Sequence, residues 1–145
     1  MRPVTIFRSL LASTIAMCLL SLPAQAQETD VGGVRHPASV SVQGTNLQLN
    51  GAGIRYKAVF KVYTAGLYLS QKADTPEAVL AATGPKRMHI TMLREIDANE
   101  LGKLFTRGVE DNTQKGEYAR LVPGLIRMGE VFSAHKKLMP GDTFT

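Results

Sequence analysis

The stretch from Gly51 to Leu69 constrains the fold of this chain more than any other. It is the longest β-rich run in the sequence, and it opens with two glycines that flank an alanine. From Ile54 onward every second residue is almost always apolar, whereas the residues between them begin charged, with Arg55 and Lys57, and become apolar toward the end. Because side chains alternate between the two faces of a strand, this pattern predicts one long strand, half-exposed at its start and buried on both faces at its end.

The N-terminus has the three parts of a secretory signal peptide in the usual order. Arg2 and Arg8 supply the positive start, the apolar run 10–22 follows, and Ala26 closes an Ala-x-Ala cleavage pattern. The apolar run is shorter than the roughly 20 residues that cross a bilayer. We therefore predict a signal peptide at residues 1–26, cleavage after Ala26, a periplasmic or secreted product, and no stable membrane span after cleavage.

Cleavage leaves residues 27–145, enough for one domain. The single cysteine, Cys18, departs with the leader, so the mature chain has no disulfide and no thiolate site. Two of the seventeen basic residues also lie in the leader, which lowers the formal charge from +5 to +3. Export, scattered basic residues and the absence of tryptophan together argue against a nucleic-acid partner.

The first part of the mature chain reads as strands separated by turns. The polar segment 27–33 is expected to be loose, and 38–42 alternates as a short strand. A turn is expected at 43–46, followed by a second strand around Leu47 and Leu49. Asn50-Gly51 is a further turn signal.

The second part of the mature chain is predicted to be mainly helical. Thr75 followed by proline has the form of a helix start, 86–93 alternates as a strand, and Asp97 opens a capping box. A last helical region is interrupted near its start by Pro123-Gly124, and 143–145 begins a strand that does not develop. We expect from that abrupt end that the chain is C-terminally truncated.

The candidate binding or catalytic side chains lie in one group on the predicted long strand. His36, His89 and His135 lie in separate segments without metal-ligand spacing, so we expect no metal and no cofactor. Arg55 offers a charged fork that matches a carboxylate or phenolate, and a neighbouring hydroxyl such as that of Thr64 can donate a further hydrogen bond. The same groups would stabilise negative charge that develops in a reaction. The alternative is an ordinary strand with an exposed arginine.

These residues also resemble a known family. Gly51-Ala-Gly-x-Arg55, then Phe60-Lys-Val-Tyr-Thr-Ala-Gly-Leu-Tyr-Leu69, then Ile90-Thr-Met-Leu93 before a helix, resemble the chalcone isomerase-like family over 31–145, and most closely its bacterial exported branch. The resemblance implies an α+β fold, an open-faced β-sandwich in which a helical layer covers one side of a large antiparallel sheet. Members of the family usually continue beyond the point where this chain stops.

The resemblance also assigns positions in a cleft. Arg55 matches a strand arginine and Thr64 a threonine that flank the cleft of the plant enzymes. In this chain, Leu101 occupies the position of a helical tyrosine of those enzymes, and Gly108 occupies the position of a helical asparagine. Related non-catalytic members resemble fatty-acid binders, in which the strand arginine and a nearby tyrosine hold the carboxylate.

We therefore predict an exported, non-catalytic protein that binds a small apolar ligand with a carboxylate or carbonyl head, such as a fatty acid. The expected ligand-binding residues are Arg55, Tyr56, Tyr63, Thr64, Leu101 and Phe105. One alternative is an isomerase, an intramolecular lyase acting on a chalcone-like unsaturated ketone through Arg55, Thr64 and an ordered water. Another is an interaction protein of the cell envelope.

Overall fold

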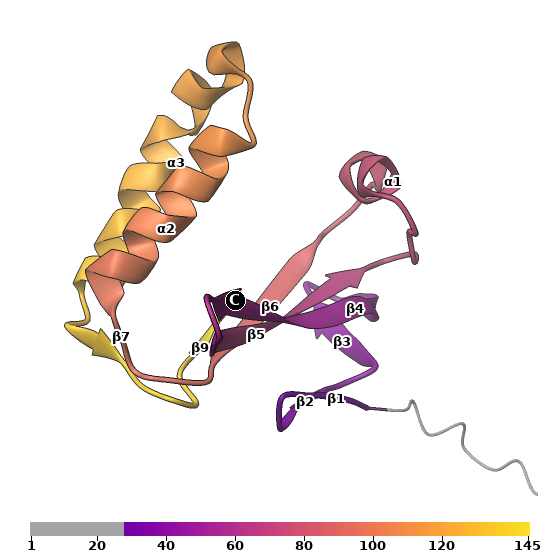
Figure 1. Ribbon diagram of the computed structural model, residues 1–145. Helices are drawn as coiled ribbons and strands as arrows, with labels where there is room; N and C mark the ends of the chain where they lie inside the picture. The colour runs from indigo at the N-terminus through magenta and orange to yellow at the C-terminus, as the bar shows by residue number, and fades with distance from the viewer. Residues whose placement is uncertain (1–27) are drawn as a thin grey trace, which may run out of the picture.

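The computed structural model describes residues 28–145 (Figure 1). The predicted signal peptide and its cleavage site lie outside the described residues. The strands are β1 (Thr29–Val31), β2 (Val34–His36), β3 (Ser39–Val42), β4 (Thr45–Lys57), β5 (Phe60–Leu69), β6 (Arg87–Met92), β7 (Ile96–Asp97), β8 (Lys137–Leu138) and β9 (Thr143–Phe144). The helices are α1 (Pro76–Ala81), α2 (Ala98–Asp111) and α3 (Lys115–Ser133).

The largest sheet is antiparallel and has the strand order β3-β4-β5-β6-β9. Two small ribbons, β1-β2 and β7-β8, accompany it. Figure 1 shows all three helices on one side of this sheet and the β1-β2 ribbon on the other. The expected α+β open-faced arrangement is confirmed, and the strand predicted at 143–145 is β9, which pairs with β6.

The long strand predicted from Ile54 to Leu69 is wrong, because the stretch folds back on itself as a hairpin. Lys57 and Phe60 form the last pair of β4 and β5, with Ala58 and Val59 in the turn between them. Ala58 has a φ of 52°, a left-handed conformation that costs a non-glycine residue about 1–2 kcal/mol. The alanine and valine at the turn carry no local turn signal, and the pairing of two long β-rich strands outweighs this strain.

Two other sequence expectations in the first half are also wrong. Asn50 is not in a turn: β4 continues through it, with an irregularity in the pairing between Leu49 and Gly51. The Asn50 side chain instead holds the Ala73 backbone, accepting from its N–H at 2.7 Å and donating to its carbonyl at 3.0 Å. The segment expected to be loose contains β1 and the start of the β1-β2 ribbon.

The helix starts follow the sequence more closely. The Thr75 hydroxyl accepts from the Ala78 N–H at 3.2 Å, and the Asp97 carboxylate accepts from the Glu100 N–H at 3.0 Å. Both caps satisfy amide groups that have no partner within the helix. The interruption predicted at Pro123 is wrong, because α3 runs through it from Lys115 to Ser133.

Apolar packing divides between the two faces of the sheet. The cluster on the helical side joins β5, β6, α2 and α3, and its buried members are Val62, Ile90, Met92, Ala98, Leu101, Phe132 and Leu138. A smaller cluster consists of Leu47, Leu49 and Tyr68. Helices α2 and α3 are therefore anchored at the end of the sheet near β6.

The β1-β2 ribbon packs on the second face through His36. This side chain is fully buried, and its Nδ1 lies 2.6 Å from the position that a β-carbon on Gly66 would occupy. Burial lowers the pKa of His36, although the Asp30 carboxylate opposes the shift, so the neutral imidazole is favoured. Gly66 is thus the residue that allows the ribbon to sit against the sheet.

We predict that Gly66→Ala destabilises the fold by about 1–3 kcal/mol, the usual cost of forcing a methyl group into a packed site. Denaturant unfolding measures the change. Gly53→Ala is the matched control, because no atom of residues 28–145 beyond its chain neighbours lies within 4 Å of its added β-carbon. An equal effect of the two substitutions on the free energy of unfolding would contradict the packing of His36 on Gly66.

Candidate functional site

An open cleft of about 1030 Å³ lies between the large sheet and α2. Figure 1 shows α1 and α2 rising from the same side of the sheet, with the cleft-lining strands between them. Its size is that of a small-molecule site. The residues that line it are Arg55, Tyr56, Lys57, Ala58, Val62, Tyr63, Leu80, Met88, Leu101, Leu104, Phe105, Gly108, Val109, Asn112 and Thr113.

Arg55 and Tyr63 are direct neighbours across the β4-β5 pair, and both line the cleft. Paired residues share a face of the sheet, so the guanidinium and the phenol project into the same space. Burial raises the pKa of Tyr63, and the nearby charge of Arg55 only partly offsets this. The phenol is therefore neutral near pH 7 and available as a hydrogen-bond donor beside a fixed cation.

Stacked aromatic rings connect this pair to the helices. The ring centres of Tyr63 and Phe105 are 6.1 Å apart, and those of Phe105 and Phe132 are 5.6 Å apart. Phe132 in turn is 5.3 Å from Phe144 of β9. This row of rings, with the buried Leu101 beside it, closes the base of the cleft and fixes α2 against β5.

The charge of the cleft has one sign. Arg55 and Lys57 are the cations of its lining, which contains no carboxylate among the described residues. Within residues 28–145, the ion pairs involve Arg35, Lys103 and Lys137 and leave Arg55 without an acidic partner. An apolar space with an unpaired guanidinium at its edge is suited to an amphiphilic anion.

Thr64 is the one predicted site residue that the structure does not bring into the cleft. It pairs with Ile54 on β4 and Thr91 on β6, one position out of step with Arg55 and Tyr63. It therefore lies on the opposite face of the sheet, where it is fully buried. Among the described residues its hydroxyl has no hydrogen-bond partner.

The other predicted residues line the cleft together, and several further ones join them. Leu80 of α1, Met88 of β6, and Leu104 and Val109 of α2 add apolar surface that the sequence did not single out as a site. The helical spacing of Leu104 and Val109 with Leu101 was the available signal. Asn112 also lines the cleft, one turn beyond Gly108, and its side chain donates to the Gly108 carbonyl at 2.8 Å.

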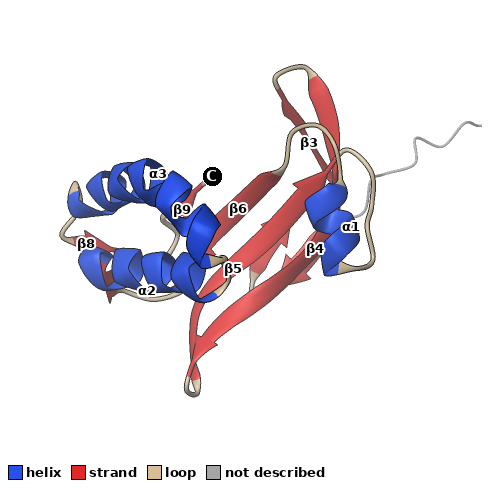
Figure 2. Ribbon diagram, turned by 90° about the horizontal axis from the view of Figure 1, so that it is seen from above, coloured by secondary structure: helices blue, strands red, loops and turns tan. Residues whose placement is uncertain are grey.

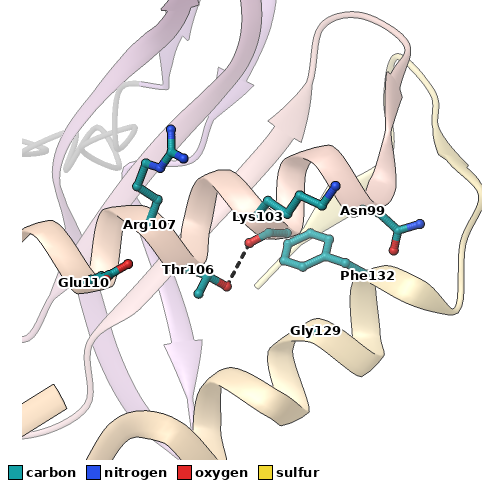
Figure 3. A pocket seen from close by; sticks show the side chains of 8 residues that line it. Asn99, Lys103, Thr106, Arg107, Glu110, Gly129 and Phe132 are labelled. Carbon is teal, nitrogen blue, oxygen red and sulfur yellow. Dashed lines mark hydrogen bonds between the residues drawn. The ribbon is translucent and has the colours of Figure 1, made fainter. Parts of the chain in front are cut away.

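A second groove of about 550 Å³ runs between α2 and α3 (Figure 3). Phe132 fills the space that Gly102 leaves, with its Cβ and Cδ2 atoms each 3.3 Å from where a β-carbon on Gly102 would stand. The Thr106 hydroxyl donates to the Gly102 carbonyl at 3.1 Å, and Arg107 points away from α3. These polar groups do not converge on a common point, so the groove is best explained as the seam where two helices pack.

An antiparallel sheet with helices on one face and an apolar cleft between the layers defines an open-faced α+β sandwich. Residues 28–145 match the model of the chalcone isomerase-like family, and the chain belongs to that family. No curated protein matches the sequence. The resemblance drawn from Arg55 and the motifs around it is thereby confirmed at the level of the family.

Two general features of the described part of the chain bear on function. From residue 28 to residue 145, no three His, Cys, Asp or Glu side chains are grouped so as to hold a metal ion. In the same range, no helix has the length and apolar character needed to cross a bilayer.

We predict that Thr64→Val perturbs the second face of the sheet and not the cleft. Replacing an unpaired buried hydroxyl by a methyl group should leave the free energy of unfolding unchanged or raise it by about 1 kcal/mol. Backbone amide shifts in NMR spectra should change around His36 and β6. Tyr63→Phe is the control and should change the amides of α2 near Phe105. Amide changes in α2 caused by Thr64→Val would show that Thr64 reaches the cleft after all.

Proposed function

We propose that this protein binds a small apolar molecule with an acidic head, such as a long-chain fatty acid, in the cleft between the sheet and α2. The observation that carries the proposal is the position of Arg55, a cation without an acidic partner among residues 28–145, at the edge of an apolar space. Tyr63 beside it supplies a neutral phenol.

The two ends of such a ligand would meet different surroundings. Its carboxylate would accept hydrogen bonds from the Arg55 fork and from the Tyr63 hydroxyl, which are stronger than bonds between neutral groups. Its chain would lie along the apolar side chains of α2, with Leu80 and Met88 opposite. Met88 is half exposed and flexible, so it can adapt to chains of different shape.

The alternative of an isomerase acting on a chalcone-like ketone keeps one supporting observation. Arg55 and Tyr63 together could stabilise a phenolate or enolate that forms in the cleft. The alternative loses Thr64, which is buried on the other face, and Leu101 and Gly108 offer no side-chain donor. A cyclisation assay with a chalcone, run on wild type and Tyr63→Phe, decides between the two: we expect no rate above the uncatalysed one.

We predict that Arg55→Ala weakens the binding of palmitic acid about tenfold, which corresponds to about 1.4 kcal/mol of binding free energy. This is near the lower limit of what a hydrogen bond to a charged group contributes, and we choose that limit because Arg55 is exposed. Isothermal titration calorimetry measures the dissociation constants. Methyl palmitate, which lacks the charge, should bind wild type and Arg55→Ala alike.

The matched control is Arg107→Ala, which removes an exposed arginine of α2 that does not line the cleft. It should leave palmitic acid binding unchanged. If both arginine variants weaken binding to the same extent, the effect is one of overall charge, and the anchoring role of Arg55 is refuted.

We further propose that the chain is exported and begins at Gln27 in its working form. Support comes from the charged start, the apolar run and the Ala-x-Ala pattern before Gln27. Expression of the full sequence in a bacterium, followed by mass spectrometry of the purified protein, should give a product that lacks residues 1–26. An intact N-terminus recovered from the cytoplasm would contradict export.

A further inference from the structure

The turn between β4 and β5 forms a projecting point, which we call the hairpin tip and define as residues 56–61. Figure 2 shows this hairpin extending past the rest of the sheet, with its turn at the bottom of the view. Every residue of the tip is exposed. Both strands continue into the cleft, because Arg55 of β4 and Val62 of β5, on either side of the tip, line it.

The end of the hairpin tip is apolar. Val59 in the turn is 82% exposed, Phe60 beside it is 55% exposed, and Tyr56 is 47% exposed. Single exposed apolar residues are common on protein surfaces, but an aliphatic and an aromatic side chain at the apex of a projecting hairpin present one continuous point. Contact between water and these apolar side chains is unfavourable, so binding to a partner that buries them would be favoured.

Cations surround the apolar end. Lys57 pairs with Phe60 and Lys61 pairs with Tyr56, so each face of the hairpin carries one lysine beside one aromatic ring. The Arg94 guanidinium lies 4.6 Å above the centre of the Phe60 ring. Residues 51–61 include no acidic residue. Glu95, the acid next to Arg94, is engaged by Lys137.

The shape of the tip distinguishes between kinds of partner. A stable protein interface removes about 800 Å² from each partner and needs a broad complementary surface, which a two-residue turn does not offer. A lipid surface needs no complementary shape. It accepts aliphatic and aromatic side chains at the level of the headgroups, while lysines behind them meet anionic phosphates.

We propose that the hairpin tip docks on an anionic lipid surface, with Val59 and Phe60 inserted among the headgroups and Lys57, Lys61 and Arg94 against the lipid phosphates. Docking in this way does not depend on what the cleft binds. It would place the outer end of the cleft against the lipid, where amphiphilic acids are found, and this last consequence rests on the function proposed above.

The chain offers a specific probe for this contact. It contains no tryptophan, so Phe60→Trp introduces a single tryptophan at the tip and keeps an aromatic ring below Arg94. The full sequence is expressed, the processed protein is purified, and vesicles of phosphatidylglycerol mixed with phosphatidylcholine are added. We expect a blue shift of the emission and quenching by brominated lipid, with neither effect on vesicles of phosphatidylcholine alone.

Vesicle sedimentation of further variants separates the two contributions. Val59→Ser with Phe60→Ser should abolish measurable binding. Lys57→Ser with Lys61→Ser should weaken it roughly 25-fold, about fivefold for each lysine near the surface. The control removes two exposed apolar residues of α3 by Ile126→Ser with Val131→Ser, which are 60% and 54% exposed and should bind like wild type.

Circular dichroism verifies that each variant is folded, and the N-terminus is the same in all of them. Lipid binding that survives the Val59 and Phe60 substitutions, or that is lost equally in the α3 control, would overturn the proposal. So would a tryptophan signal that responds to protein concentration or to a single-stranded oligonucleotide rather than to anionic vesicles. Loss of vesicle binding with palmitic acid binding intact would leave the proposed function standing.

Discussion

The pairing of Arg55 with Tyr63 is the interaction on which the rest of the site depends. It is set by the register of the two longest strands: their pairing starts at the turn of Ala58 and Val59, and a one-residue shift between Tyr56 and Arg55 then brings Arg55 opposite Tyr63. A shift of one residue in that register would move every side chain of β5 to the other face. Arg55 would then face a different neighbour, Tyr63 would leave Phe105, and the sheet would lose the ring that connects it to α2.

That pairing links the stability of the domain to its cleft. The rings of Tyr63, Phe105 and Phe132 pack closely at the base, where α2 and α3 meet the sheet. Toward the hairpin tip the two layers are not packed together, and a cleft of about 1030 Å³ remains. The same architecture thus provides a closed, stable end and an open, apolar end with Arg55 at its edge.

Features encoded by a few adjacent residues could be predicted from the sequence. The caps at Thr75 and Asp97 depend on contacts three residues away, and both were found. The turn at Ala58 could not be predicted, because its left-handed alanine is held by pairing between distant strands rather than by local preference. The β1-β2 ribbon was missed for a similar reason, since it depends on the space above Gly66.

The candidate site was predicted in composition but not in every position. The family resemblance led to Arg55, Tyr63 and Leu101, and the apolar helical spacing added Phe105; the structure brings all four to the cleft. Thr64 was expected to flank the cleft together with Arg55. The register nevertheless pairs Thr64 with Ile54 and leaves it on the other face. The face that a residue occupies depends on the pairing register, and the sequence of one strand does not determine that register.

The central claim is that the Arg55 guanidinium holds the acidic head of a ligand in the cleft. Palmitic acid labelled with carbon-13 at its carboxyl group tests it directly, because the chemical shift of that carbon reports ionisation in the bound state. A carboxylate beside Arg55 should titrate with a lowered pKa, and this lowering of the pKa should be lost in Arg55→Ala. A bound carboxyl group whose pKa is raised, as burial among apolar side chains alone would produce, or one that is indifferent to Arg55→Ala, would contradict the account.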